Sequence, residues 1–263
     1  MNSHLQKAIP ILIDRDGGVT SITFNRPERM NTIDVSMAQS LAQIADDLVR
    51  DDLARVVLLR GAGSCFMAGG DIRMMREDPS HIDEVIQDFH KFVLALRRLP
   101  IPVLAVVHGS AAGAGFSLAI GCDFVIASES TKFTLAYPLL GTSPDGGSSF
   151  FLTKLLGHRR ATELMLLNEP MTARRALDLG LINWVTPDER LEQDIERIVH
   201  SLIANAPKAV AATKHLLNHS DNVILERQLE EERRLLLDCT STADFAEGID
   251  AFLQKRRPQF TGR

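Results

Sequence analysis

The run from Ile101 to Ala127 constrains the fold of this chain more than any other stretch, because it is almost continuously apolar. Its length would suit a membrane-spanning helix. His108 and Asp123 lie inside the run, however, and glycines interrupt it, which favours a buried core made of strands and turns. Val103 to Val107 is typical of a buried strand and ends in a turn-forming His-Gly-Ser sequence. We therefore expect this run to form the centre of a globular core.

A segment rich in Gly and Ala, residues 111 to 122, follows that strand. Gly113, Ala114 and Gly115 carry at most a methyl group, so a ligand can approach the main chain closely. The free N–H groups of a helix's first turn would point at such a ligand. The segment has the first two glycines of the dinucleotide fingerprint G-x-G-x-x-G but not the third, and no phosphate-binding G-x-x-x-x-G-K-S/T loop occurs in the sequence. Nucleotide-dependent chemistry therefore has little support.

Composition limits the class of protein and of partner. With 263 residues, 45% of them hydrophobic, the chain can bury one large core, with or without a smaller appendage. The formal charge is −5, from 29 Lys+Arg against 34 Asp+Glu, and both signs are spread along the chain, so neither a nucleic-acid nor a membrane partner is indicated. Cys65, Cys122 and Cys239 are widely spaced and odd in number, which disfavours disulfides. The N-terminal residues do not resemble a leader, and we expect a cytoplasmic protein.

The first half of the sequence alternates between strand-like and helix-like patterns, which predicts an α/β core. Strands are predicted over Ile9 to Ile13, Val19 to Phe24, Arg55 to Arg60, Val103 to Val107 and Phe124 to Ala127. The first two flank an Asp-Gly-Gly turn and should pair antiparallel. Helices are predicted up to Arg50 and over Ile82 to Leu99, with a loop between Gly61 and Asp71.

Beyond Gly147 apolar residues recur every three to four positions, which predicts a helical final third. Short breaks at glycines and prolines separate helices over residues 150–156, 161–167, 173–179, 191–203, 209–217, 224–237 and 245–253. A helical region packed on an α/β core is expected rather than two independent domains.

Six motifs occur in an order and spacing that resemble the crotonase family, the enoyl-CoA hydratases and isomerases. They are N-R-P-E-R-M-N at 25–31, A-G-G-D-I at 68–72, the strand and Gly-rich turn at 102–115, C-D at 122–123, L-L-G-T-S-P-D-G-G at 139–147, and E-G-I-D-A-F-L-Q-K-R-R-P-Q-F at 247–260. The resemblance covers almost the whole chain. It implies a ββα spiral core with the acyl-CoA site over residues 1–200, a C-terminal helical trimerisation region over 201–263, and trimers that often pair into hexamers.

The resemblance also implies a coenzyme A thioester as substrate, with no separate cofactor. Two backbone N–H groups, here those of Gly70 and Ala114, would bind the thioester oxygen, each typically worth ~3 kcal/mol to the transition state. The alternative is that both are turn and packing residues. Further substrate contacts are implied for Ala68, Asp71, Ile72 and Arg73, and Arg29 could reach a phosphate. Each of the charged residues could equally be solvated or cap a helix.

One departure from the family pattern bears on the reaction. Hydratases of this family position and activate water with two glutamates, and those positions align here with Ser117 and Tyr137. Serine is not acidic at neutral pH and a phenol titrates near ~10, so neither replaces a carboxylate. Two-carboxylate hydration is therefore in doubt. What remains is Asp145, where several isomerases of the family and the 4-halobenzoyl-CoA dehalogenases place their acidic residue.

A single carboxylate at Asp145 suits a proton shuttle, which predicts an enoyl-CoA isomerase. The competing interpretation is a helix N-cap, because Pro-Asp-Gly-Gly-Ser-Ser before an apolar helix is a good capping signature. Three other functions stay open: a hydratase with an atypical site, a dehalogenase-like enzyme using His90 and Tyr137 beside the aspartate, and a binding protein without turnover. No metal site is predicted, because Leu216 stands where the zinc motif H-E-x-x-H needs Glu.

Overall fold

The computed structural model describes residues 9–219 and 221–262, so part of the N-terminal stretch used for the leader expectation lies outside it. Within these ranges the strands are β1 (Ile11–Asp16), β2 (Val19–Phe24), β3 (Val56–Gly61), β4 (Val103–Val107), β5 (Ser110–Ala112), β6 (Phe124–Ser128), β7 (Lys132–Thr134), β8 (Met171–Thr172) and β9 (Trp184–Thr186). The helices are α1 (Val35–Val49), α2 (Ile72–Glu77), α3 (Ile82–Arg98), α4 (Ala114–Gly121), α5 (Ser148–Leu167), α6 (Ala173–Asp178), α7 (Leu191–Ile203), α8 (Pro207–His219), α9 (Asn222–Thr240) and α10 (Ala243–Leu253). Short 3-10 turns are η1 (Pro27–Arg29), η2 (Pro79–His81), η3 (Tyr137–Leu140) and η4 (Asp188–Arg190).

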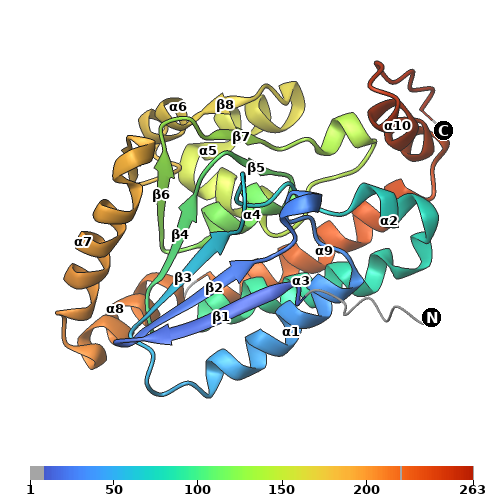
Figure 1. Ribbon diagram of the computed structural model, residues 1–263. Helices are drawn as coiled ribbons and strands as arrows, with labels where there is room; N and C mark the ends of the chain where they lie inside the picture. Colours follow the sequence, from blue (N-terminus) through green and yellow to red (C-terminus); the bar gives the residue numbers. More distant parts are fainter. Residues whose placement is uncertain (1–8, 220, 263) are drawn as a thin grey trace, which may run out of the picture.

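The larger sheet has the strand order β1-β2-β3-β4-β6-β9 in the described part of the chain. β1 and β2 pair antiparallel, as predicted, around Gly17 and Gly18, whose positive φ angles of 55° and 84° suit glycine in a tight turn. Every other pairing in this sheet is parallel. Parallel neighbours require crossover connections, and here the intervening helices supply them (Figure 1).

A three-stranded sheet, β5-β7-β8, completes a repeated ββα unit. β4 continues through β5 into α4, and β6 continues through β7 and η3 into α5. β3 does the same with a single bridging residue, Met67, which pairs with Ala111 of β5 before the chain enters α2. Successive units therefore stack their second strands side by side, which confirms the predicted spiral of ββα units.

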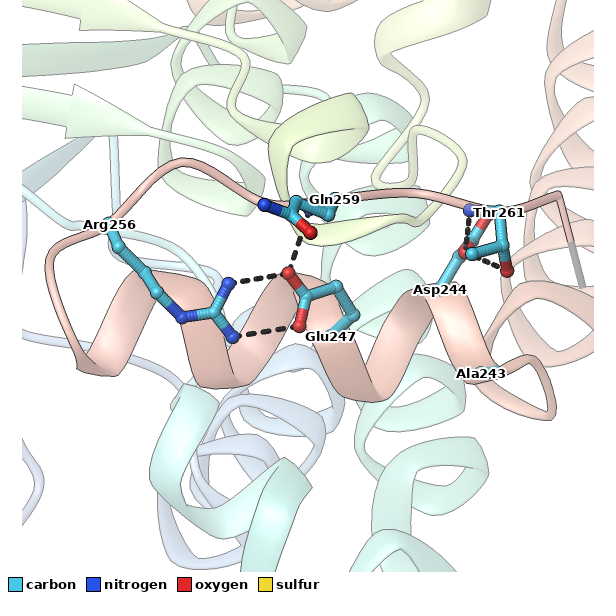
Figure 2. Close-up of a pocket in the computed structure, with 6 residues that line it drawn as sticks. All are labelled: Ala243, Asp244, Glu247, Arg256, Gln259 and Thr261. Atoms are coloured by element: carbon cyan, nitrogen blue, oxygen red, sulfur yellow. Dashed lines mark hydrogen bonds and ion pairs between the residues drawn. The ribbon is translucent and has the colours of Figure 1, made fainter.

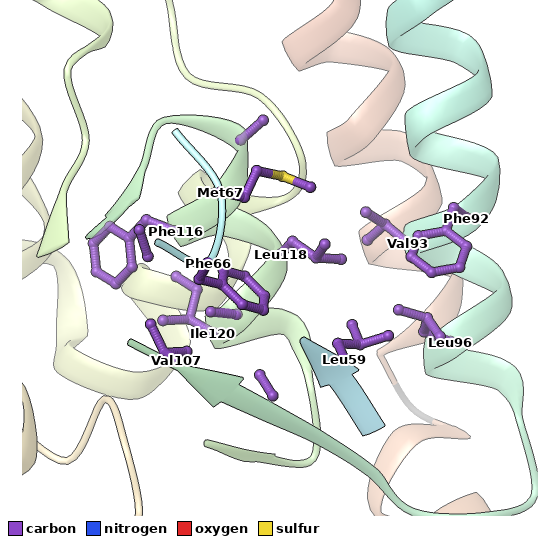
Figure 3. Packing of buried hydrophobic residues seen from close by; sticks show 14 of the residues in the cluster. Leu59, Phe66, Met67, Phe92, Val93, Leu96, Val107, Phe116, Leu118 and Ile120 are labelled. Atoms are coloured by element: carbon purple, nitrogen blue, oxygen red, sulfur yellow. The ribbon is translucent and has the colours of Figure 1, made fainter. Parts of the chain in front are cut away.

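Both faces of the larger sheet are covered, which explains why its central strands are apolar throughout rather than alternating. Leu58, Leu104 and Ile126 pack on one face against Leu191 and Ile195 of α7, the orange helix at the edge of Figure 1. The neighbouring positions point to the other face and pack against α1, α3 and α4. Figure 3 shows this second core, with side chains from the sheet, α3 and α4 meeting: Leu59, Val107, Phe92, Val93, Leu96, Phe116, Leu118 and Ile120.

The fold differs from the sequence predictions in its short elements. The strands β5, β7, β8 and β9 and the helix α2 were not predicted, because two to six residues carry too little periodicity. The two helices predicted over 150–156 and 161–167 both lie within α5, and the break predicted at Gly157 is confirmed, because its φ of 72° and ψ of 164° are not helical. The predicted boundary at residue 200 falls within α7, and the division into a core and a trimerisation region stays a prediction.

Hydrogen bonds and close packing hold the C-terminal helices against the core. Buried Lys214 of α8 donates to the backbone carbonyls of Leu96 and Ile101 and to the carboxylate of Asp123. α10 lies against η3 so closely that a Cβ at Gly248 would be 2.6 Å from the carbonyl carbon of Leu140. Of the helices in the described ranges, none combines the length and apolarity that crossing a bilayer requires.

Candidate active site

The segments that carry the N–H groups of Gly70 and Ala114 lie beside one another at the junction of two ββα units. Backbone bonds join the two segments: Ala112 N–H donates to Met67 O at 2.9 Å, and Met67 N–H donates to Ser110 O at 3.3 Å. A Cβ at Gly69 would lie only 3.4 Å from Ala114 N. Across residues 9–219 and 221–262 neither Gly70 N–H nor Ala114 N–H is used in a hydrogen bond. Two backbone donors are therefore available side by side.

Local sequence explains why these two N–H groups have no hydrogen-bond partner. Ala114 is the first residue of α4, so its N–H has no partner in the preceding turn. Ile33 N–H donates to Gly69 O and Asp71 N–H donates to Ile33 O, so this one-residue bridge uses the groups on either side of the Gly70 N–H and leaves it free. Gly115 permits the close approach, because a Cβ there would lie 2.3 Å from Met67 O. The glycines in both motifs therefore serve the geometry of the two donors.

Ser117, Tyr137 and Asp145 form one buried hydrogen-bonded chain. Tyr137 donates its hydroxyl to Asp145 Oδ1 at 2.5 Å, and the hydroxyls of Ser117 and Tyr137 are 2.8 Å apart. Ser117 Oγ donates to Gly113 O at 3.2 Å, which links the chain to the first turn of α4, beside Ala114. Among the described residues Asp145 Oδ2 has no hydrogen-bond partner, so one carboxylate oxygen can accept a proton.

Burial sets the protonation behaviour of this chain. Asp145 is 8% exposed, and burial raises the pKa of its carboxyl group to about 6, although the Tyr137 hydroxyl opposes the shift. Burial, then the charge of Asp145, raises the pKa of Tyr137 well above its usual value. This hydrogen-bonded chain therefore contains one carboxyl group that titrates near pH 6 and one phenol that is neutral at physiological pH. That is the condition in which a carboxylate can both take up and release a proton.

The capping interpretation of Asp145 is wrong. The N-cap of α5 is Gly147, in the left-handed region (φ 81°), and a glycine has no side chain with which to cap the helix. The Asp145 carboxylate turns toward Tyr137 instead. Glu232 of α9 supplies the cap, accepting from Gly147 N–H at 2.7 Å and from Ser149 N–H at 3.0 Å. A carboxylate is favourable at the positive end of a helix, and here it comes from a distant helix.

Among the residues that the structure describes, Glu232 is the one buried charged residue near this site that the sequence interpretation missed. It is 4% exposed, and the apolar stripe of α9 contains a signal for it: Leu225, Leu229, Glu232 and Leu236 share the buried face. A carboxylate at an apolar-face position indicates a buried and partnered charge. Periodicity alone does not identify the partner, because Gly147 and Ser149 lie more than 80 residues earlier.

His90 of α3 has a backbone partner rather than the aspartate. Its Nε2 accepts from Gly146 N–H at 3.2 Å, so the proton of the neutral ring is assigned to Nδ1. Burial, then the charge of Arg233, lowers the pKa of His90 to about 4. The ring is therefore neutral at physiological pH and holds the turn that follows Asp145.

The residues expected to contact substrate fall into two groups. Asp71 caps α2 through Arg73 N–H and Met74 N–H and is paired with Arg26 at 3.1 Å, so its carboxylate has structural partners. Ile72 packs on the cluster that joins α2 to α10. The second group is less engaged: Ala68 is half-buried, and Arg29 and Arg73 are exposed. These last two are free of ion pairs to other described residues and could meet a phosphate.

Two surface hollows lie away from this site. One, of about 460 Å³, lies between α10 and the C-terminal segment, where Arg256 pairs with Glu247 and Thr261 N–H donates to Asp244 (Figure 2). The other, of about 420 Å³, lies where β3, β4 and β6 end. Neither is lined by Gly70, Ala114 or Asp145. No group of three His, Cys, Asp or Glu side chains suited to a metal occurs in the described ranges.

Comparisons with known proteins agree with the geometry. The profile of the family described as Enoyl-CoA hydratase/isomerase matches residues 14–263. The chain is 37% identical to 1,2-epoxyphenylacetyl-CoA isomerase of Escherichia coli over 96% of this chain and 98% of that protein. It is 33% identical to trans-2-decenoyl-acyl-carrier-protein isomerase of Streptococcus mutans, again over 96% and 98%. A crystal structure of an enoyl-CoA hydratase from Mycobacterium avium subsp. paratuberculosis superposes with a TM-score of 0.89 at 34% identity, covering 96% and 98% of the two chains.

Proposed function

Because the chain belongs to the enoyl-CoA hydratase/isomerase family, we propose that within this family it acts as an isomerase, moving a β,γ-double bond of an acyl-CoA to the α,β-position. The observation that carries the proposal is that the hydrogen-bonded chain of Ser117, Tyr137 and Asp145 contains a single carboxylate. Asp145 stands alone there, because Ser117 and Tyr137 occupy the two positions at which hydratases of the family carry glutamates.

The proposed reaction is a proton transfer in two steps. Asp145 Oδ2 removes a proton from the α-carbon, and the electron pair moves through the carbonyl to leave a dienolate oxygen. The N–H groups of Gly70 and Ala114 donate hydrogen bonds to that oxygen, which stabilises the charge as it develops. The protonated Asp145 then returns the proton to the γ-carbon, and the conjugated enoyl-CoA leaves. Atoms and charge balance without a second reactant, so we infer that no metal or redox cofactor is required.

Electrostatics and hydrogen bonding support this role for Asp145. A general base works best when its pKa is near the operating pH, and burial brings the pKa of Asp145 to about 6. Tyr137 holds Oδ1 and leaves Oδ2 free for the proton. The dehalogenase-like alternative needs a histidine base, whereas the Nε2 lone pair of His90 is engaged by Gly146 N–H.

We expect double-bond migration to be fast and the hydration of crotonyl-CoA to be slow or absent, because Ser117 and Tyr137 stand at the two positions where hydratases of the family carry the glutamates that activate water. Matched β,γ- and α,β-enoyl-CoA thioesters incubated in deuterated water with a chelator present, and followed by mass spectrometry, separate the products. Isomerisation interconverts two thioesters that chromatography separates, and it introduces deuterium only as far as the proton held by Asp145 exchanges with solvent. Hydration adds the mass of water, and thioester hydrolysis releases coenzyme A. A hydration rate at or above the isomerisation rate would show that the proposal is wrong, and binding without turnover would indicate a binding protein.

We also propose that the protein assembles as a trimer or a hexamer through its C-terminal helices. The support is the set of large apolar side chains that α5, α8 and α9 leave exposed, Leu155, Leu166, Leu216, Leu217 and Ile224. Such surface is commonly covered in an assembly. Sedimentation velocity should give a mass of three or six chains, and a monomer at micromolar concentration would contradict the proposal.

A further inference from the structure

The turn that carries Asp145 is closed by bonds from one residue, Ser148, whose N–H and Oγ donate to Asp145 O at 3.2 Å and 3.0 Å. Gly146 and Gly147 follow the aspartate directly, with positive φ angles of 64° and 81°. Glycine has more conformational freedom than any other residue, so two in succession fix the direction of the preceding side chain poorly. A general base must nevertheless be held in one place relative to the proton that it removes. Contacts from outside the turn must therefore supply the missing order.

Two side chains from other helices supply these contacts. His90 of α3 accepts from Gly146 N–H, while Glu232 of α9 accepts from Gly147 N–H at 2.7 Å and from Ser149 N–H at 3.0 Å. Ser149 Oγ donates to Glu232 Oε1 at 2.5 Å and itself accepts from Gln228, one turn earlier on α9. Glu232 thus binds three donors with two oxygens, which a neutral amide could not do.

We propose that Glu232 is a positioning residue for the Asp145 base: by accepting from the Gly147 and Ser149 N–H groups it anchors the turn that carries Asp145. The inference rests on the proposed function, because it takes Asp145 to be the base. Glu232 does not itself touch the reacting atoms in this account. Its effect reaches the reaction through the Gly147 and Ser149 N–H groups.

Burial also couples the titration of Glu232 to that of Asp145. Burial raises the pKa of Glu232 to about 7, the bonds from Ser149 and Gly147 oppose that shift, and the charge of Asp145 adds to it. Because the pKa of Glu232 lies above that of Asp145, Glu232 is mostly neutral while Asp145 titrates, and the charge of Asp145 then raises the pKa of Glu232. The two carboxylates therefore titrate as a coupled pair.

The other groups that face this pair have partners of their own. Tyr137 of η3 donates to Asp145 and stays a neutral phenol, and His90 of α3 stays a neutral imidazole. Arg233 and Glu230 of α9 act on His90 and bind one another. Glu232 is thus the residue through which α9 acts on Asp145.

Glu232→Gln tests the proposal through the kinetics of isomerisation and their pH dependence. Loosening the turn should lower kcat about 10-fold with KM little changed, while the acidic limb of kcat/KM, which reports Asp145, should stay near pH 6. Glu231→Gln is the matched control, because Glu231 lies on the same helix, is exposed and pairs with Arg234. It should leave both quantities unchanged. Ser149→Ala, which removes one donor and keeps the charge, should lower kcat several-fold without moving the limb.

A titration without substrate separates this inference from the proposed function. Carbon-13 NMR of the carboxyl groups should show the midpoint of Glu232 falling below about 7 in Asp145→Asn, because the charge of Asp145 is then gone. If the wild-type protein does not isomerise enoyl-CoA, the proposed function fails while the titration still reports the coupling. If it does isomerise and Glu232→Gln leaves kcat unchanged, the positioning role is overturned. Should Glu232→Gln not fold, an unchanged kcat in Ser149→Ala would overturn the role instead.

Discussion

Replacement of Asp145 by Asn is expected to lower the rate of double-bond migration at least ~100-fold, the range typical of losing a general base. Asparagine has nearly the same shape and can still accept the Tyr137 hydroxyl through Oδ1, but it cannot take up the α-proton. Affinity for acyl-CoA should survive, because the Gly70 and Ala114 donors belong to the backbone. Steady-state kinetics and calorimetric titration measure the two effects.

The same variant should be more stable than the wild type at alkaline pH. The folded-state pKa of Asp145, about 6, lies above the unfolded value of about 3.8, so the native state binds the proton more tightly. The ionised carboxylate therefore costs stability fully above pH 6, and this cost disappears as the pH falls to 4. Asparagine removes it, which should raise the free energy of unfolding by about 1–3 kcal/mol at pH 8 and by little at pH 4.

Urea denaturation at pH 8 and pH 4 measures this difference. Asp14→Asn, at an exposed position on β1, is the control and should change neither stability nor turnover. An Asp145→Asn protein with wild-type turnover would remove Asp145 from the mechanism and direct the search for an acid–base group to Tyr137 and His90. If Asp145→Asn lowered the free energy of unfolding at pH 8, this would contradict a buried Asp145 carboxylate that does not cap α5.

Replacement of Lys214 by Met is expected to lower the free energy of unfolding by about 3–5 kcal/mol, the usual effect of removing one partner of a buried ion pair. Its ammonium group donates at 3.1 Å to Leu96 O, at 2.8 Å to Ile101 O and at 2.5 Å to Asp123. The substitution leaves two carbonyl groups and a largely buried carboxylate without this donor. α8 would then be held on the core mainly by apolar contacts.

Chemical denaturation with Lys208→Met as the control tests this expectation. Lys208 lies in the first turn of the same helix and is exposed, so replacing it removes a charge and no buried contact. Adding Asp123→Asn to Lys214→Met should recover part of the loss, because the orphaned charge is then gone. Equal unfolding midpoints for the two lysine variants would show that the buried contacts of Lys214 add nothing.

The elements whose apolar pattern is long enough to outweigh tertiary context were predicted well. β2 and β4 have the predicted bounds, and α7 runs from Leu191 to Ile203 as expected. Their sequences repeat an apolar pattern over five or more residues, which a local rule can detect. β5, β7, β8 and β9 have only two or three residues each, and each exists because a neighbouring strand offers it a hydrogen-bonding edge.

The candidate site divides along the same line. Sequence motifs alone identified Gly70, Ala114 and Asp145 and the replacement of two family glutamates by Ser117 and Tyr137. They also made Asp145 look like a helix cap, because capping signatures are judged from residues a few positions apart. In the structure the carboxylate of Glu232, on α9, caps the helix, and the carboxylate of Asp145 accepts a hydrogen bond from Tyr137 instead.

By itself, then, the sequence determined the family, the order of the long elements and the chemical types present at the site, since each depends on neighbours along the chain. Only the tertiary structure decided which side chain accepts which proton. Glu232 illustrates the reason: its place on the apolar stripe of α9 signals burial, but its partners Gly147 and Ser149 become neighbours only when α9 packs beside α5. Burial and partnership of charges depend on such long-range packing, and they set the pKa values on which the proposed chemistry depends.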